Sequence, residues 1–210
     1  TFTPDGKNIL FTARIQDPAA SALFPKSSMT ELYSVSVDGG RYEQVLATPA
    51  EEVSFIGNDG AFVYQDCKGG ENIWRKHHTS SVTRDIWMYD GSKHVKLTSF
   101  EGEDRSPRVS ADGKTVYFMS ERDGSFNVYS FSVDDPQNVT RVTRHKTHPV
   151  RFLTLSDNDD ICYGYDGDIY DVNGNDVVEV ADAIVPTIEE GGISAITGQH
   201  QSKSNVLFTS

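Results

Sequence analysis

Apolar and polar residues alternate along this chain in short segments, and turn sequences separate these segments. The clearest stretch covers residues 106–145, where two alternating segments flank Asp112-Gly113. That dipeptide supplies the positive φ angles of a tight hairpin turn. Two further segments, 128–133 and 139–143, repeat the period of two that is typical of strands. This stretch therefore predicts four short antiparallel strands.

The same pattern recurs along the chain. The turn pairs begin at Asp5, Asp59, Asp112 and Asn158, in steps of 54, 53 and 46 residues. Propeller repeats have about 40–50 residues, so each step fits one blade with a modest insertion. We therefore predict an all-β fold, a β-propeller of four-stranded antiparallel blades. The alternative is a hairpin-rich β-sandwich. The expected blades, which together form one partial propeller domain over residues 1–210, are 1–49, 50–99, 100–149, 150–182 and a partial fifth at 183–210.

The lengths of the connections predict an interaction face. In an up-and-down blade, the turns between the first two strands and between the last two lie on one side of the propeller. These turns are uniformly short here, whereas two connections between second and third strands, residues 14–29 and 68–84, are long. Long loops on one side of a rigid scaffold are where propellers tend to place function. We expect both loops, and the link 100–105, to lie on that face.

The second long loop and the link after it carry the densest polar chemistry. Arg75, Lys76 and Arg84 have the charge to bind an anionic or carboxylate group. The alternative is that Trp74 anchors the loop on a neighbouring blade or domain while the charges stay solvated. We also expect the acidic residues of the link to pair with the loop cations across blades. The candidate residues of the interaction face are Trp74, Arg75, Lys76, His77, His78, Arg84, Glu101, Glu103, Asp104 and Arg105.

Composition and motifs exclude several classes of function. The net charge of −12 argues against a general nucleic-acid binder, and no run of 18 apolar residues predicts a membrane span. Adjacent residues such as His77 and His78 point to opposite sides of an extended strand, and His145 and His148 have no third ligand nearby. No Gly-x-Ser-x-Gly elbow presents a nucleophile. We therefore expect no metal, no cofactor and no catalytic residue in this chain.

Longer runs of the sequence resemble the amino-terminal propeller of bacterial tricorn-like serine proteases. The most specific of these is Trp-Arg-Lys-His-His-Thr-Ser-Ser-Val-Thr-Arg-Asp-Ile-Trp at 74–87, with Phe-Thr-Pro-Asp-Gly-Lys at 2–7 and Phe-Glu-Gly-Glu-Asp-Arg at 100–105. The similarity covers residues 1–172, and the tail 177–210 departs from the family pattern. The chain opens inside a repeat, so we expect it to be about four and a half blades, the later blades of a six-bladed propeller in a longer protein.

The resemblance also implies a function. Such proteins are multidomain peptidases whose propellers are thought to gate or filter peptides, while a separate domain carries the nucleophile. The implied partners are peptides or unfolded polypeptide and the neighbouring domains of the same chain, and a homo-oligomer stays open. Bacterial members are often exported, which implies the periplasm, with the cytoplasm as alternative. Two rival interpretations are a stand-alone scaffold similar to TolB and the propeller cap of a prolyl-oligopeptidase-like enzyme.

Overall fold

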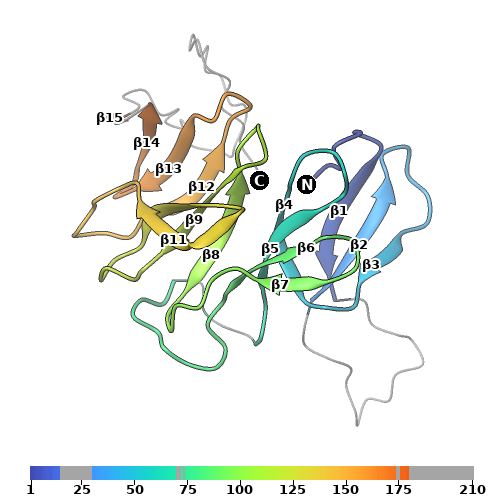
Figure 1. The fold of residues 1–210 in the computed structure, drawn as a ribbon, viewed down its shortest axis with the longest axis horizontal. Coiled ribbons are helices and arrows are strands. Elements are labelled where there is room, and N and C mark those ends of the chain that lie inside the picture. The colour runs from blue at the N-terminus through green and yellow to red at the C-terminus, as the bar shows by residue number, and fades with distance from the viewer. Residues whose placement is uncertain (15–29, 70–71, 73, 174–175, 180–210) are drawn as a thin grey trace, which may run out of the picture.

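A computed structural model describes residues 1–14, 30–69, 72, 74–173 and 176–179 of the chain. Throughout these residues the regular structure is strand, without a helix, and the strands form four antiparallel sheets (Figure 1). The predicted all-β fold is therefore confirmed. The expected insertion at 14–29, apart from Arg14, and the expected partial blade at 183–210 lie outside the described residues.

In the described part of the chain, fifteen strands make up the four sheets, and the strands of each sheet lie in sequential order. The first sheet contains β1 (Asn8–Ala13), β2 (Glu31–Ser36) and β3 (Glu43–Leu46). The second contains β4 (Ala50–Phe55), β5 (Phe62–Asp66), β6 (Ile86–Tyr89) and β7 (His94–Lys96). The third contains β8 (Asp104–Val109), β9 (Thr115–Ser120), β10 (Asn127–Ser132) and β11 (Asp135–Arg141). The fourth contains β12 (Arg151–Leu155), β13 (Ile161–Tyr165), β14 (Asp168–Asn173) and β15 (Asp176–Glu179).

The sheets follow one another around an arc, with the first strand of each toward the inside (Figure 1). Strand β8 contacts β4 and β5 of the sheet before it and β12 of the sheet after it. Sequential four-stranded antiparallel sheets packed in this way are propeller blades. We therefore describe the four sheets as blades 1 to 4.

Blade 1 differs from the expected four full strands. Its predicted first strand near Phe2 forms only an isolated bridge to Ile9. Two backbone hydrogen bonds extend the pairing, from Thr3 N to Asn8 O at 2.9 Å and from Leu10 N to Thr1 O at 2.7 Å. Residues 1–3 therefore occupy the position of an inner strand without being long enough to count as one.

Two other strand boundaries differ from the sequence pattern. Strand β8 begins at Asp104, so the last two residues of the predicted link 100–105 belong to blade 3. Strand β11 runs from Asp135 to Arg141 rather than over 139–143, because Ser132 pairs with Asp135 across a two-residue turn. These strand residues are polar, so the alternation of apolar side chains does not predict them.

Tight turns connect the first two strands of blades 2, 3 and 4, and join residues 1–3 to β1, on one side of the propeller, at the top of Figure 1. Gly6 and Gly113 have φ angles of 67° and 73°, as the Asp-Gly pairs predict. In blade 4 Asp159 takes the corresponding position with a φ of 65°. Aspartate is one of the few residues that adopt this conformation readily, so the turn survives without glycine.

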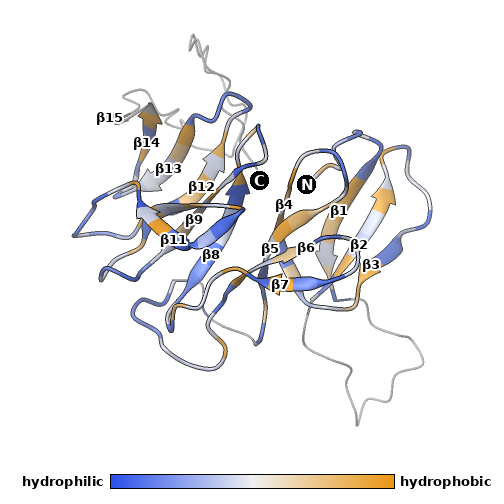
Figure 2. Ribbon diagram, viewed as in Figure 1, coloured by the Kyte–Doolittle hydropathy of each residue, from blue (hydrophilic) through white to orange (hydrophobic). Residues whose placement is uncertain are grey.

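The hydrophobic core lies between successive blades, and the middle strands contribute to it from both faces. In β9, Val116 and Phe118 belong to the cluster shared with blade 2, whereas Tyr117 and Met119 pack into the cluster shared with blade 4. A third cluster, built around Leu32, Phe62 and other side chains, joins blades 1 and 2. The apolar colour concentrates accordingly on the strands in Figure 2. Both faces of a middle strand are therefore apolar and buried, each against a different neighbouring blade.

The inner strands of blades 2, 3 and 4 share a backbone irregularity. Glu52, Ser106 and Phe152 have φ angles of 54°, 53° and 56°. Each residue lies within a shift of the strand register, which marks a β-bulge. The left-handed conformation costs roughly 1–2 kcal/mol for an L-residue. Because three blades repeat it at one position, the strain belongs to the geometry of the inner strand.

This strain predicts the effect of glycine at Ser106. The change Ser106→Gly removes the steric cost, partly offset by the extra chain entropy of glycine, so the free energy of unfolding should rise by about 0.5 kcal/mol. The β-branched change Ser106→Val should lower it by about 1–2 kcal/mol. Equilibrium unfolding in urea measures both. The control Ser34→Gly, within the regular strand β2, should lower stability by about 0.5–1 kcal/mol. Equal losses at both glycine positions would contradict backbone strain at Ser106.

Candidate functional site

The long loop 68–84 leaves blade 2 on the side opposite the tight turns and runs beneath the next blades (Figure 1). Lys68 ties its two ends together. The Lys68 ammonium donates to the carbonyl oxygen of Thr83 at 2.6 Å and to Asp85 Oδ2 at 2.5 Å. A second ion pair joins Lys68 to Asp66 at 3.2 Å. The two ends of the loop are therefore held together at blade 2, and its middle extends to blades 3 and 4.

Blade 3 holds the middle of the loop through one carboxylate. The backbone N–H groups of His77 and His78 donate to the two oxygens of Glu121, at 2.5 and 3.2 Å. His77 adopts a φ of 53°, which turns the two N–H groups toward the same acceptor. Hydrogen bonds to an ionised acceptor are stronger than neutral ones. The backbone of this segment is therefore fastened to Glu121.

Blade 4 contacts the loop through aromatic rings. Trp74 meets Phe152 edge to face, with ring centroids 6.2 Å apart. The Arg151 guanidinium lies 5.5 Å from the centre of the Trp74 ring and 5.0 Å from that of Phe126. Aromatic and cation–π contacts of this kind are worth about 0.5–1.5 kcal/mol each. The loop thus contacts three successive blades, with Trp74 at its far end.

Arg84, at the end of the loop, is buried in an ionic cluster. Its guanidinium lies 3.6 Å from Glu103 Oε1 and 3.8 Å from Glu51 Oε2, and its side chain is only 7% exposed. These pairs are too long for hydrogen bonds, and the Nε and Nη1 atoms have no hydrogen-bond partner. Burial raises the pKa of the Glu103 carboxyl, while the charges of Arg84 and Arg105 oppose that shift. The pair between Arg84 and Glu103 lies at the boundary of blades 2 and 3, as the opposite charges predicted.

Asp104 has a different partner from the one expected. It is fully buried and accepts two hydrogen bonds from Arg122 Nη2, at 3.1 and 3.0 Å, instead of pairing with the loop cations. The Arg122 guanidinium also lies over the rings of Phe118 and Tyr129. Both Asp104 and Arg122 belong to blade 3, so this pair stabilises one blade rather than joining two.

Arg105 lies between the buried charges and the aromatic residues. Its guanidinium is 5.0 Å from the centre of the Phe126 ring. Burial lowers the pKa of Arg105 to about 10, and the positive charges of Arg151 and Arg84 act in the same direction. Arg105 stays charged at neutral pH, so three cations share this region with the carboxylates of Glu103 and Glu121.

The predicted residues therefore divide into two groups. Four are buried side chains, of which the pair of Arg84 and Glu103 joins the end of the loop to blade 3, and this group consists of Arg84, Glu103, Asp104 and Arg105. Solvent-facing residues form the surface of the loop and the nearby link, and this group consists of Trp74, Arg75, Lys76, His77, Glu101 and, partly, His78. The exposed group offers apolar and cationic contacts to a ligand. Within the described part of the chain, no three metal-ligating side chains gather.

Three residues of this region were not predicted from the sequence. Glu121, Arg151 and Phe152 contact the loop from blades 3 and 4. The repeat could have predicted Arg151. Positions 51, 105 and 151 are separated by 54 and 46 residues, close to the spacing of the turn pairs, so they are equivalent positions of successive blades. All three positions carry charged residues at the inner-strand bulges. No sequence spacing points to Glu121.

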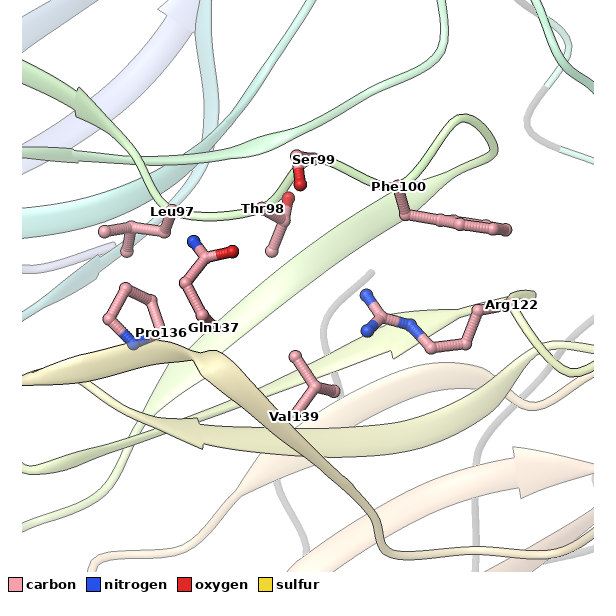
Figure 3. Close-up of a pocket in the computed structure, with 8 residues that line it drawn as sticks. All are labelled: Leu97, Thr98, Ser99, Phe100, Arg122, Pro136, Gln137 and Val139. Carbon is pink, nitrogen blue, oxygen red and sulfur yellow. The ribbon is translucent and has the colours of Figure 1, made fainter.

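Two cavities lie beside this region. One of about 230 Å³ separates the link after β7 from strand β11, and Figure 3 shows Arg122 directed into it. A second of about 440 Å³ has Lys68 and Lys96 on its wall, but both ammonium groups pair with Asp85. Small-molecule sites usually enclose about 300–1,000 Å³ with polar groups free to contact the ligand. In the second cavity the two ammonium groups are already neutralised by Asp85.

The buried pair of Arg84 and Glu103 generates a stability prediction. The change Arg84→Ala leaves the Glu103 carboxylate, 6% exposed, without its partner, so the free energy of unfolding should fall by about 3–5 kcal/mol. The double change Arg84→Met with Glu103→Leu removes both charges and should recover most of the loss. Urea unfolding measures each variant.

A surface pair provides the control for this experiment. Lys114 lies 4.0 Å from Asp112, and its side chain is 77% exposed. Lys114→Ala should therefore change stability by only about 0–1 kcal/mol. If Arg84→Ala costs no more than Lys114→Ala, the cluster does not fasten the loop.

Comparison with known proteins places this geometry in context. Within the described residues no helix could span a membrane. No curated protein matches the chain. Solved structures do match, and the matches include several peptidases.

The tricorn protease structure matches with a TM-score of 0.71 and 24% identity, over 90% of this chain and 17% of that one. The putative TolB of Agrobacterium tumefaciens matches with a TM-score of 0.64 and 18% identity, over 85% of this chain and 62% of that one. A puromycin-hydrolyzing peptidase of Mycobacterium tuberculosis matches with a TM-score of 0.62 and 12% identity, over 87% and 30%. These identities establish the fold alone, and the chain spans less than two thirds of each of these proteins.

The family match is more specific than the structural ones. The family described as the tricorn protease N-terminal β-propeller domain matches residues 1–177. That range includes the four blades up to β15 and the whole of the loop 68–84. The expected resemblance is therefore confirmed. This chain belongs to the tricorn protease N-terminal β-propeller domain family.

Proposed function

We propose that this propeller is a non-catalytic part of a tricorn-like serine peptidase, in which it filters peptides and docks on neighbouring domains. The observation that carries the proposal is the family match over residues 1–177, together with the exposed loop that those residues build. The buried charges and the Glu121 contacts hold the loop 68–84 in place. Peptides therefore meet a fixed surface, which is what selection by shape and charge requires.

The chemistry of the loop supports peptide handling. Arg75, Lys76 and His77 are exposed, on a chain whose net charge is −12. A local cationic surface attracts carboxylate groups, and those of acidic side chains and of peptide C-termini are the abundant ones in polypeptides. We assign the interaction face to this segment. We propose the periplasm as its compartment, with the cytoplasm as alternative, and peptides or unfolded polypeptide as its partners.

The second candidate function is a stand-alone scaffold. The similarity to the putative TolB covers 62% of that protein, a larger share than the 17% of tricorn protease. A scaffold would use the same face to bind a folded protein and would hydrolyse no peptide. The two functions therefore differ in whether the full chain turns over peptides.

Peptide turnover by the full chain tests the filter. The double change Arg75→Ala with Lys76→Ala removes two exposed cations, so cleavage of long acidic peptides should fall about three- to tenfold in kcat/KM. Cleavage of short neutral fluorogenic peptides should stay the same, because they need no guidance from the loop. The measurement is kcat/KM over a series of peptide lengths and charges.

A charge-matched control uses the opposite face. Lys93 and Lys114 are exposed near the tight turns after β6 and β8, and the double change Lys93→Ala with Lys114→Ala should leave all peptides unaffected. If the two double changes lower kcat/KM equally, the net charge of the protein explains the effect, and the proposed filter is wrong. A full chain without any peptidase activity would favour the scaffold.

A further inference from the structure

Two of the most exposed apolar side chains of the described residues meet each other. Phe152 is 70% exposed and Trp74 is 56% exposed, yet their rings form an edge-to-face pair at 6.2 Å. They come from different blades and lie far apart in the sequence. Single exposed apolar residues are common on protein surfaces, whereas exposed rings that gather usually mark a contact with another molecule.

The backbone holds Phe152 in this exposed position. It lies at the β-bulge of β12, where its φ is 56°, and a bulge turns a side chain out of the regular alternation of a strand. Blades 2 and 3 place Glu52 and Ser106 at the corresponding positions. Blade 4 thus presents an aromatic ring where its neighbours present polar groups. Strained positions of this kind recur at ligand contacts.

Trp74 is held from its other side. The Arg151 guanidinium lies between the Trp74 ring at 5.5 Å and the Phe126 ring at 5.0 Å, and its Nη1 atom is buried without a hydrogen-bond partner. The Trp74 backbone N–H donates to Asn72 Oδ1 at 2.9 Å, which fixes the turn that carries the ring. Both rings are therefore ordered before a ligand arrives, which lowers the entropy cost of binding.

The charge around the pair identifies the ligand. Arg75 and Lys76 follow Trp74 directly and are exposed, so any segment that covers the rings passes a cationic surface. We infer that Trp74 and Phe152 form an aromatic clamp for a bulky apolar side chain of an acidic, extended peptide. This inference rests on the proposed function and deepens it. It assigns the apolar specificity to the clamp and the preference for acidic neighbours to the loop cations.

Binding of labelled peptides to the full chain tests the clamp. Three fluorescein-labelled peptides of equal length serve as probes: one with a central Phe flanked by Asp residues, one with Ala for the Phe, and one with Lys for the Asp residues. Fluorescence anisotropy should show that the first binds about tenfold more tightly than either of the others. Trp74→Ala and Phe152→Ala should each remove about that factor for the first peptide only, because burying one aromatic side chain supplies it.

Matched variants make the result specific. Phe2 is 62% exposed in blade 1, so Phe2→Ala should leave all three affinities unchanged. Phe152→Tyr keeps the ring and should retain tight binding, which separates loss of the clamp from loss of folding. The double change Trp74→Ala with Phe152→Ala should lose less than the product of the single effects, because the rings act on one ligand side chain.

The outcomes separate the clamp from the proposed function. If the full chain cleaves peptides but Trp74→Ala and Phe152→Ala leave all affinities unchanged, the clamp is wrong and the filter stands. If these variants disturb docking of a neighbouring domain without changing peptide affinity, the rings are a domain contact and the clamp is also wrong. If the full chain neither binds nor cleaves peptides, the clamp and the proposed function fail together.

Discussion

The structure depends on the need of each middle strand to bury two apolar faces at once. A strand such as β9 sends Val116 and Phe118 to one side and Tyr117 and Met119 to the other. Neither face is covered by the blade itself, so each blade is stable only between neighbours. The flat stack that would satisfy this need is prevented by the twist of the strands, and the blades instead turn around an axis.

The arrangement of blades around an axis also shapes the inner strands. They converge near the axis, and three of them contain a bulge at a residue with positive φ. The bulges place charged side chains at positions 51, 105 and 151 close to the ends of the strands. A cluster of buried arginines and glutamates results there, with Arg84 and Glu103 at its centre. Its charges are costly to desolvate, so they stabilise the fold only while each keeps its neighbours.

The loop 68–84 is attached to the blades partly through this cluster. Lys68 closes the base, Arg84 enters the buried charges, and Glu121 holds the backbone of the middle segment. The exposed aromatic and cationic residues are therefore attached to three blades instead of one. Such a connection limits the motion of the loop and of the blades relative to each other, which suits a surface that discriminates between ligands.

Elements with strictly local causes could be predicted from the sequence. Asp-Gly turns fix their own φ angles, and alternation over five or six residues reports strand and face. Their recurrence led to the propeller, and a long run of specific residues at 74–87 led to the family. Polar strand ends such as Asp104 and Asp135 were missed, because backbone pairing holds them without any apolar signal.

The partners of the charged residues were decided by the tertiary structure. The sequence contains Asp104, Arg84 and Arg122 without any rule that pairs the first with the third. Likewise, the contacts of Glu121 with His77 and of Phe152 with Trp74 join different blades. Which side chains meet across blades depends on the rotation between them and on the bulges of the inner strands, and both follow from packing of the whole. The sequence by itself determined the strands, the turns and the repeat, because these depend on neighbours along the chain. Only the tertiary structure decided which residues form the site.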